Sequence, residues 1–239
     1  MKNILFAGLI FSCLSGCTQS NSTTKQNQQS ISPDSLFTLG MYYLNEDTDK
    51  PQYDSAKYYL EKAVESNHKK SLHVLGYEYL LGSKLQRDKK KGLSYLEKAS
   101  ELGETEAYLS LAEFYYYQNE PTQVKAFLEK GSSLGDKYAM YQLHMLYYEG
   151  YAFGQPQKKD ESLINLQKGF DYLLRAAEMG SLNAQLALVY LYAKGKQGLL
   201  EADIKKLKYY FELAEKNPEA QEVPGATDEL EIAKKELNF

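Results

Sequence analysis

The chain has 239 residues, and its 28 lysines and arginines nearly balance 32 aspartates and glutamates, which leaves a formal net charge of −4. This weak acidity, with both signs mixed along the sequence, argues against nucleic acid as a partner. Only two cysteines and three histidines are present, so few residues could ligate a transition metal. The 22 tyrosines, against no tryptophan, are the unusual feature that the fold has to explain.

Residues 1–16 have the features of a secretory signal peptide. Lys2 supplies a short positive region, and residues 4–11 form an apolar run too brief to span a bilayer as a helix. The segment closes on Leu14-Ser15-Gly16-Cys17, which resembles the bacterial lipobox. The resemblance implies that Cys17 carries the lipid (palmitate) and becomes the first residue of the mature lipoprotein. An ordinary signal peptide with a chance cysteine is the alternative.

The residues after the cysteine bear on location. An aspartate directly after it would retain a lipoprotein at the inner membrane of enteric bacteria, whereas this chain has Thr18. We therefore expect a lipid-anchored protein of the cell envelope, in the outer membrane and facing the periplasm. Residues 17–33 are polar and nearly devoid of apolar side chains, so they predict a flexible tether. Folded structure is expected from Asp34 onward.

Beyond Asp34 the sequence repeats five times. Twelve-residue segments align without gaps from Ser35, Ser71, Ala107, Ala139 and Ala184, with starts 36, 36, 32 and 45 residues apart. The fifth residue is always leucine and the ninth always tyrosine: Leu39 and Tyr43, Leu75 and Tyr79, Leu111 and Tyr115, Leu143 and Tyr147, Leu188 and Tyr192. A period of this length is typical of an array of supersecondary units.

A second segment follows each first one. These segments end at Asn67, Gly103, Gly135, Gly180 and Pro218. Four residues before each end stands a small residue, where neighbouring helices can approach closely: Ala63, Ala99, Gly131, Ala176 and Ala214. Glycine and asparagine suit the left-handed residue that closes a helix, and proline cannot continue one. Each repeat is therefore predicted as helix, turn, helix.

The combined pattern A-x-x-x-L-G-x-x-Y-x-x-G, then Y-x-x-A-A-x-x-G, resembles the Sel-one-like repeat, a relative of the tetratricopeptide repeat. The resemblance implies an all-α fold, a right-handed α/α superhelix (solenoid) of five helix-turn-helix repeats over residues 34–218. Glu46 and Gln118 depart from the pattern at the turn glycine. Residues 219–239 are expected to form a C-terminal capping helix, with Asp228 as its N-cap.

The tyrosines fall into two groups. A helix turns about 100° per residue, so positions five and nine share one face of each first helix, and positions three, seven and ten lie on the opposite side. The repeat tyrosines at position nine are expected in the core. The opposite side, which lines the concave surface of helix-pair solenoids, holds a single charged residue, Glu113. We expect about half of it to pack against the next repeat and the rest to bind a protein partner. The candidates are Tyr77, Tyr116, Tyr148 and Tyr190.

A second candidate surface is the insertion in the fourth repeat. Tyr151 and Phe153 lie between Gly150 and Gly154, in a loop longer than its counterparts. Loops held by a rigid scaffold often carry function. A tolerated insertion without function is the equal alternative.

No motif predicts an active site. Gly131-Ser132-Ser133-Leu134-Gly135 matches G-x-S-x-G, but both glycines occupy repeat positions at the end of a predicted helix, whereas a nucleophile elbow follows a strand. His68, His73 and His144 make no metal motif, and no phosphate-binding loop is present. We expect no catalytic residue, metal, cofactor or small-molecule substrate, and hence no enzyme.

The leading interpretation is a non-catalytic protein-protein interaction module, anchored in the bacterial envelope by its N-terminal lipid. Some lipid-anchored Sel-one-like proteins resemble this chain and act as periplasmic immunity proteins that neutralise a secreted effector, for example a phospholipase. A cell-wall-binding or hydrolytic protein is a further alternative. The sequence leaves the identity of the protein partner open.

Overall fold

The computed structural model describes residues 31–45, 52–196, 198–222 and 226–236. The predicted signal peptide, Cys17 and nearly all of the predicted tether lie outside the described residues. Within those ranges, no helix combines the length and the apolar character that crossing a membrane requires.

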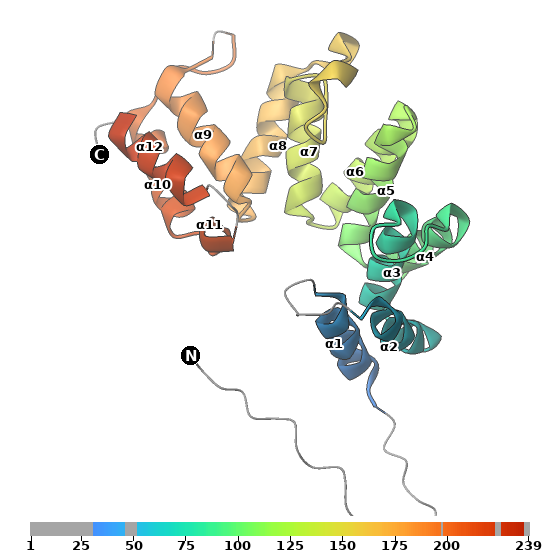
Figure 1. The fold of residues 1–239 in the computed structure, drawn as a ribbon. Helices are drawn as coiled ribbons and strands as arrows, with labels where there is room; N and C mark the ends of the chain where they lie inside the picture. Colours follow the sequence, from blue (N-terminus) through green and yellow to red (C-terminus); the bar gives the residue numbers. More distant parts are fainter. Residues whose placement is uncertain (1–30, 46–51, 197, 223–225, 237–239) are drawn as a thin grey trace, which may run out of the picture. The chain divides into compact units, whose positions relative to one another are not determined.

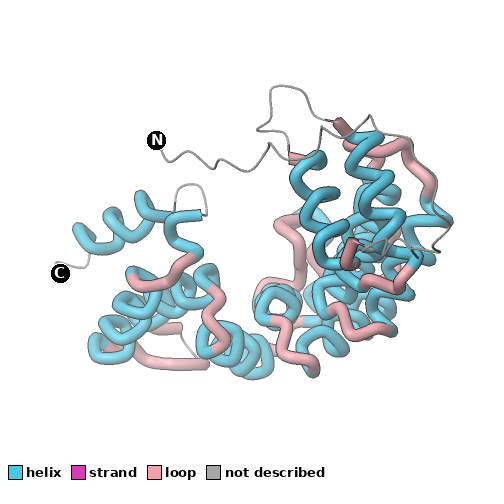
Figure 2. The backbone as a smooth tube through the Cα atoms, turned by 90° about the horizontal axis from the view of Figure 1, so that it is seen from below, coloured by secondary structure: helices cyan, strands magenta, loops and turns pink. Residues whose placement is uncertain are grey.

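Five helix pairs follow one another along the chain (Figure 1). The pairs are α1 (Pro33–Leu44) with α2 (Tyr53–Glu65), α3 (Lys69–Leu81) with α4 (Lys89–Glu101), α5 (Thr105–Tyr117) with α6 (Pro121–Ser133), α7 (Lys137–Tyr148) with α8 (Leu166–Glu178), and α9 (Leu182–Lys194) with α10 (Ile204–Glu215). Figure 2 shows helices joined by loops, with no strand in the described part of the chain. These pairs confirm the predicted all-α, right-handed solenoid of helix-turn-helix repeats.

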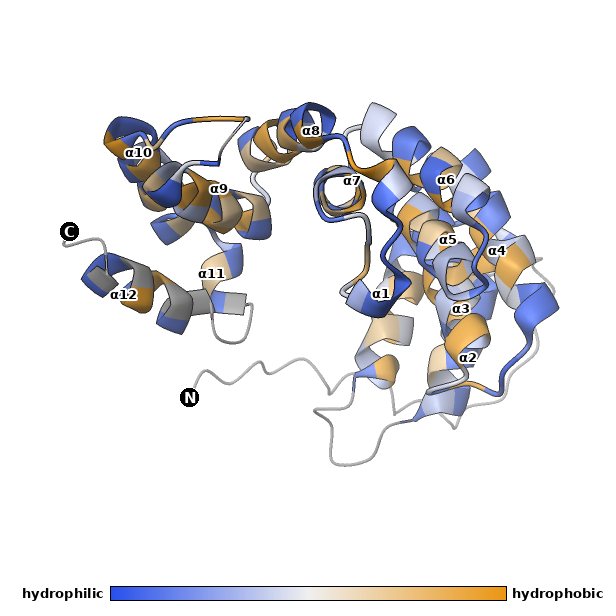
Figure 3. Cartoon of the chain, turned by 90° about the horizontal axis from the view of Figure 1, so that it is seen from above, coloured by the Kyte–Doolittle hydropathy of each residue, from blue (hydrophilic) through white to orange (hydrophobic). Residues whose placement is uncertain are grey.

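Each first helix packs most extensively on its own second helix, and each second helix then contacts the next first helix. Polar and apolar residues alternate around the helices (Figure 3), as expected for helices with one face in a core. The repeat leucines Leu75, Leu111, Leu143 and Leu188 are completely buried. Leu39 is only half-buried, because no repeat precedes α1 among the described residues.

The turns between repeats have the predicted left-handed residue. Asn67, Gly103, Gly135 and Gly180 follow the second helices with φ of 56°, 79°, 89° and 80°. Inside the third repeat, Gln118 replaces the turn glycine and stays right-handed. The next residue, Asn119, takes the positive φ of 58° instead, since asparagine tolerates this region better than most side chains.

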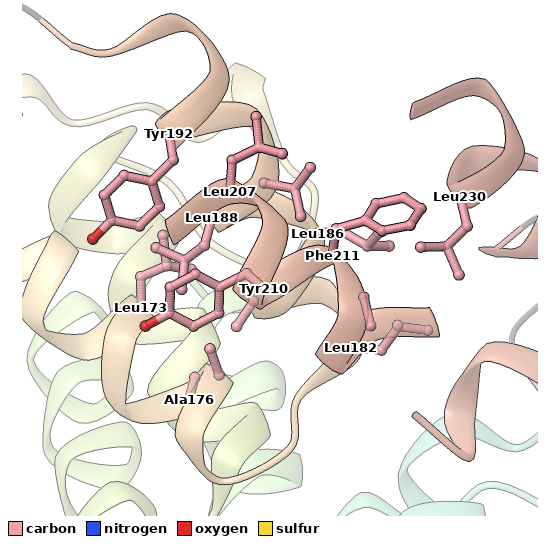
Figure 4. Close-up of a cluster of buried hydrophobic side chains, with 14 of the residues drawn as sticks. Leu173, Ala176, Leu182, Leu186, Leu188, Tyr192, Leu207, Tyr210, Phe211 and Leu230 are labelled. Carbon is pink, nitrogen blue, oxygen red and sulfur yellow. The ribbon is translucent and has the colours of Figure 1, made fainter. Parts of the chain in front are cut away.

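Two helices follow the fifth pair, α11 (Glu219–Glu222) and α12 (Ala226–Glu236). The prediction that Asp228 caps the last helix is wrong, because α12 already begins at Ala226 and Asp228 lies inside it. Leu230 of α12 is buried in the same cluster as Phe211 of α10. Figure 4 shows the Leu230 side chain directed toward that ring. The last helix therefore covers apolar side chains of the fifth repeat.

Candidate functional site

The repeat tyrosines each meet an aromatic ring of their own second helix. The pairs are Tyr43 with Tyr59, Tyr79 with Tyr95, Tyr115 with Phe127, Tyr147 with Tyr172, and Tyr192 with Tyr210, at centroid distances of 5.5 to 6.0 Å. Four pairs are stacked and the Tyr79 pair meets edge to face. Such pairs stabilise by about 0.5–1.5 kcal/mol beyond the area that they bury. This aromatic seam accounts for much of the tyrosine bias.

The expected core position of these tyrosines is confirmed for three of them. Tyr79, Tyr147 and Tyr192 are 4 to 6% exposed, whereas Tyr43 and Tyr115 are half-buried. The Tyr79 hydroxyl donates to Glu61 at 3.0 Å. A buried phenol thus keeps a hydrogen-bond partner, as the core interpretation requires.

Two of the repeat interfaces carry a polar contact that we call the clasp. It consists of a glutamate from one repeat and a tyrosine and a lysine from the next: Glu61, Tyr79 and Lys91, and again Glu129, Tyr147 and Lys168. Lys91 lies 2.9 Å from Glu61 and 3.0 Å from the Tyr79 hydroxyl. Burial opposes ionisation of Glu61, but hydrogen bonds from Lys91 and Tyr79 outweigh it and lower the pKa of this carboxyl.

The second clasp has the same partners. Lys168 donates to the Tyr147 hydroxyl at 2.8 Å and lies 3.6 Å from Glu129. Its ammonium group also lies 4.2 Å from the centroid of the Tyr147 ring. Each clasp joins three helices and two repeats, so we assign it a structural role.

The side of the first helices predicted to bind a partner contains both buried and accessible positions. At position ten, Leu44, Leu80 and Tyr116 are 4 to 7% exposed. Position seven remains more open, with Met41 and Tyr190 each 37% exposed and Tyr77, Glu113 and Met145 half-buried. Because α5 contacts both α3 and α7, the side chains of Tyr77, Glu113 and Met145 stand on neighbouring helices. We call these three residues the first-helix face.

The prediction that the Tyr116 side chain is accessible to a protein partner on the concave surface is wrong. The insertion in the fourth repeat covers it, which leaves the residue 7% exposed. Its hydroxyl accepts from the Ala152 amide at 3.2 Å and donates to the Gln155 carbonyl at 3.4 Å. Lys158 donates to the Tyr116 carbonyl at 2.8 Å and lies 5.1 Å from the ring centroid.

The remaining candidate tyrosines are more accessible. Tyr77 and Tyr148 are half-buried, and the Tyr148 ring lies 5.0 Å from the ring of His144. Lys196 lies 5.3 Å from the centroid of Tyr148. The four tyrosines predicted to share one binding surface therefore have different surroundings. Tyr77 belongs to the first-helix face, and Tyr190 is exposed at the same position of α9. Tyr116 and Tyr148 instead make contacts between repeats.

The insertion itself is tied down at both ends. Asp160 donates its amide to the Gly150 carbonyl at 2.8 Å, and Asn165 donates to the Tyr147 carbonyl at 2.7 Å. Phe153 is half-buried in a left-handed conformation, and its ring lies 5.4 Å from that of Tyr116. Tyr151 is half-buried beside it. The loop is thus part of the contact between the third and fourth repeats.

A pocket of about 240 Å³ opens where the insertion meets the turn between α5 and α6. Its lining combines apolar and charged side chains: Tyr116, Pro121, Val124, Leu146 and Leu163, with Glu120, Lys125, Lys158 and Asp160. One wall comes from the insertion, so repeats without it lack this arrangement. The volume suits a single apolar side chain of a protein better than a drug-sized ligand.

The residues considered for catalysis have structural roles. Ser133, the central serine of G-x-S-x-G, ends α6 and donates to the Lys130 carbonyl at 2.7 Å. His144 is buried, and its Nδ1 lies 3.0 Å from the Gly169 carbonyl oxygen. His73 lies 2.9 Å from the Ser110 hydroxyl. Among the described residues, no group of three or more acidic, histidine or cysteine side chains could hold a metal ion.

Comparison with known proteins gives the family. The Sel1 repeat profile matches residues 33–68, 69–104, 137–181 and 183–217, more than half of the chain. The chain belongs to the Sel1 repeat family. Sel1 repeat proteins mediate protein–protein interactions, and their fold is typically a non-catalytic scaffold. The third helix pair falls between the matched ranges, although α5 and α6 pack on each other as the other pairs do.

Solved structures of Sel1 repeat proteins share this fold. A Sel1 repeat protein from Oxalobacter formigenes is 24% identical, with a TM-score of 0.60, over 77% of this chain and 73% of that one. The protective antigen c5321 of uropathogenic Escherichia coli is 21% identical, with a TM-score of 0.55, over 86% of this chain. The aligned part makes up only 42% of that antigen. At these identities the likeness concerns the fold alone.

A weaker likeness involves the immunity protein Pa5087 from Pseudomonas aeruginosa. It is 21% identical over 76% of this Sel1 repeat chain and 80% of that one, with a TM-score of 0.41. A score this low does not bear on function, so the immunity hypothesis stays a prediction. Among curated proteins, none matches the chain in a sequence comparison.

Proposed function

We propose that this Sel1 repeat chain is a non-catalytic protein-binding module held at the bacterial envelope by a lipid on Cys17. The observation that supports it most is the first-helix face. Four of the five repeat leucines and three of the five position-ten side chains are buried, whereas position seven keeps accessible apolar surface on several of the first helices. Accessible apolar side chains on a rigid scaffold are typical of protein-binding surfaces.

In-cell photo-crosslinking tests the binding surface. Tyr77 is replaced by the photoreactive amino acid benzoylphenylalanine, which keeps an aromatic ring on the first-helix face. Tyr209, which is 57% exposed on α10, receives the same replacement as a control. We expect a discrete crosslinked protein from position 77 and none from position 209. Equal crosslinking at both positions, or none at position 77, contradicts binding at this face.

Metabolic labelling with a palmitate analogue tests the anchor. The wild-type protein should incorporate the label and fractionate with membranes, because Cys17 closes the lipobox-like sequence. Cys17→Ser should lose the label. Replacing Cys13, which lies within the predicted signal peptide, should leave it unchanged. Persistent labelling of Cys17→Ser would end the lipoprotein interpretation while leaving the binding proposal intact.

A further inference from the structure

Glu113 is an exception on the first-helix face. It is the one charged side chain among positions three, seven and ten of the five repeats. It stands on α5, half-buried, between Tyr77 on α3 and Met145 on α7. The other residues at these positions are apolar, aromatic or, in one repeat, histidine.

No side chain neutralises this carboxylate. Within the described ranges, Glu113 makes neither a hydrogen bond nor an ion pair. Burial raises the pKa of Glu113, and no neighbouring cation opposes that effect. The clasp glutamates differ, since Glu61 and Glu129 each lie within 4 Å of a lysine. The first-helix face therefore contains a partly desolvated negative charge without a counter-ion.

A tyrosine occupies the same repeat position on the neighbouring helix, since Tyr77 stands on α3 and α3 contacts α5, which holds Glu113. Burial and then the charge of Glu113 raise the pKa of Tyr77. An arginine side chain suits this pair, because its planar guanidinium can donate hydrogen bonds to a carboxylate and at the same time stack on an aromatic ring. A divalent cation does not suit it, since calcium and magnesium need several oxygen ligands and only one carboxylate is present.

We propose that a protein partner places an arginine side chain on the first-helix face, with its guanidinium paired to Glu113 and packed against Tyr77. This inference rests on the proposed function, and it adds the chemistry of the partner. Around the ion pair, Met145 and the neighbouring half-buried side chains would exclude water and so strengthen the pairing.

Selection from a phage-displayed random peptide library tests the inference. The purified full chain, its Glu113→Gln variant and a Glu101→Gln control serve as targets; Glu101 is an exposed glutamate on α4. We expect the wild type and the control to enrich arginine-containing peptides. Selected peptides should bind Glu113→Gln about tenfold more weakly or worse, and replacing their arginine by citrulline should have the same effect.

The outcomes separate this inference from the proposed function. If the wild type enriches peptides without arginine, or if they bind Glu113→Gln equally well, the inference is overturned and protein binding stands. If no peptide is enriched, the result contradicts both the arginine inference and the proposed protein binding.

Thermal unfolding of the free proteins gives a second, independent measurement. Glu113→Gln should melt at the same or a higher temperature than the wild type, because it removes an uncompensated charge. A clearly lower melting temperature would show that Glu113 supports the fold and would overturn its assignment to a partner.

Discussion

Tyr116 joins the third repeat to the insertion of the fourth through both its ring and its hydroxyl. The ring contacts Phe153 and Lys158, and the hydroxyl bonds to the backbone of Ala152 and Gln155. A residue with these contacts is a structural part of the loop that it holds. The pocket beside it consequently depends on the same side chain.

We expect Tyr116→Phe to lower the free energy of unfolding by about 1–3 kcal/mol, because the buried Ala152 amide loses its acceptor. Amide hydrogen exchange should show faster exchange at Ala152, and urea unfolding should report the stability loss. Tyr117→Phe is the matched control, since Tyr117 is 50% exposed. Equal effects of the two substitutions would mean that the hydroxyl does not hold the insertion.

His144 predicts a pH dependence. Burial lowers its pKa to about 4 from the ordinary 6.5, against a hydrogen bond to Gly169. Between these values the unfolded chain binds a proton that the folded chain does not, so stability falls as the pH is lowered from about 7 to 4. A shift of this size corresponds to about 3 kcal/mol.

The test compares wild type with His144→Ala, because other groups titrate in the same range. Burial and the neighbouring Glu106, for example, raise the pKa of Glu104 to about 7, which acts in the opposite direction. The stability difference between wild type and His144→Ala, followed by chemical unfolding at several pH values, isolates His144. That difference should shrink toward pH 4, and a constant difference would refute the burial argument.

Side-chain direction around the first helix was predictable only in part. The sequence pattern correctly separated positions five and nine from positions three, seven and ten. Positions seven and ten are only about 60° apart around the helix, so helical geometry alone places both on the same side. Their burial nevertheless differs: the insertion covers Tyr116, and the Leu80 side chain packs beside Gly92 of its own second helix. That information depends on contacts between segments far apart in the sequence.

At the scale of helices, the clasp recurs at the interfaces between repeats one and two and between repeats three and four. The interface between repeats two and three has the glutamate and the tyrosine of the clasp, Glu97 and Tyr115. Gln123 stands where the other two clasps have a lysine. Tyr115 is correspondingly only half-buried, unlike Tyr79 and Tyr147. The missing cation suggests a stabilising substitution.

We expect Gln123→Lys to raise the free energy of unfolding by about 0.5–1 kcal/mol, since it supplies a partner for the Tyr115 hydroxyl and for Glu97. Urea unfolding measures the change. The same substitution in a Glu97→Ala, Tyr115→Phe background should give no gain, because both acceptors are removed. A gain that persists in that background would have another origin.

The aromatic partner of each repeat tyrosine could have been found in the sequence. These partners occupy one aligned position of the second segments, namely Tyr59, Tyr95, Phe127, Tyr172 and Tyr210. Their recurrence is as regular as that of the small residues near the helix ends. The path of the insertion could not be found in this way, because it depends on Tyr116, some 36 residues before Ala152.

For the whole molecule, the array consists of neighbouring interfaces, so damage at one end should remain local. Ending the chain at Glu222 removes α12 and uncovers Phe211, which is 5% exposed in the intact structure. We expect a lower melting temperature and faster amide exchange confined at first to α9 and α10. Leu230→Ala should reproduce part of the effect. Uniform loss of protection in all repeats would contradict a nearest-neighbour array.

Glu219 connects the end of the chain to a much earlier helix. It pairs with Lys137 at 2.6 Å, accepts from the Tyr138 hydroxyl and accepts the Leu182 amide at 3.1 Å. The contact with Tyr138 spans 81 positions, whereas Lys69 reaches the Gly103 carbonyl at the end of its own repeat across 34.

This difference has a consequence for biosynthesis. A chain synthesised from its N-terminus can complete each repeat as soon as the following helix emerges, because the contacts needed are short in sequence. The junction of α7, α9 and α11 must wait for residue 219, so the fourth and fifth repeats acquire these contacts only after α11 has been synthesised.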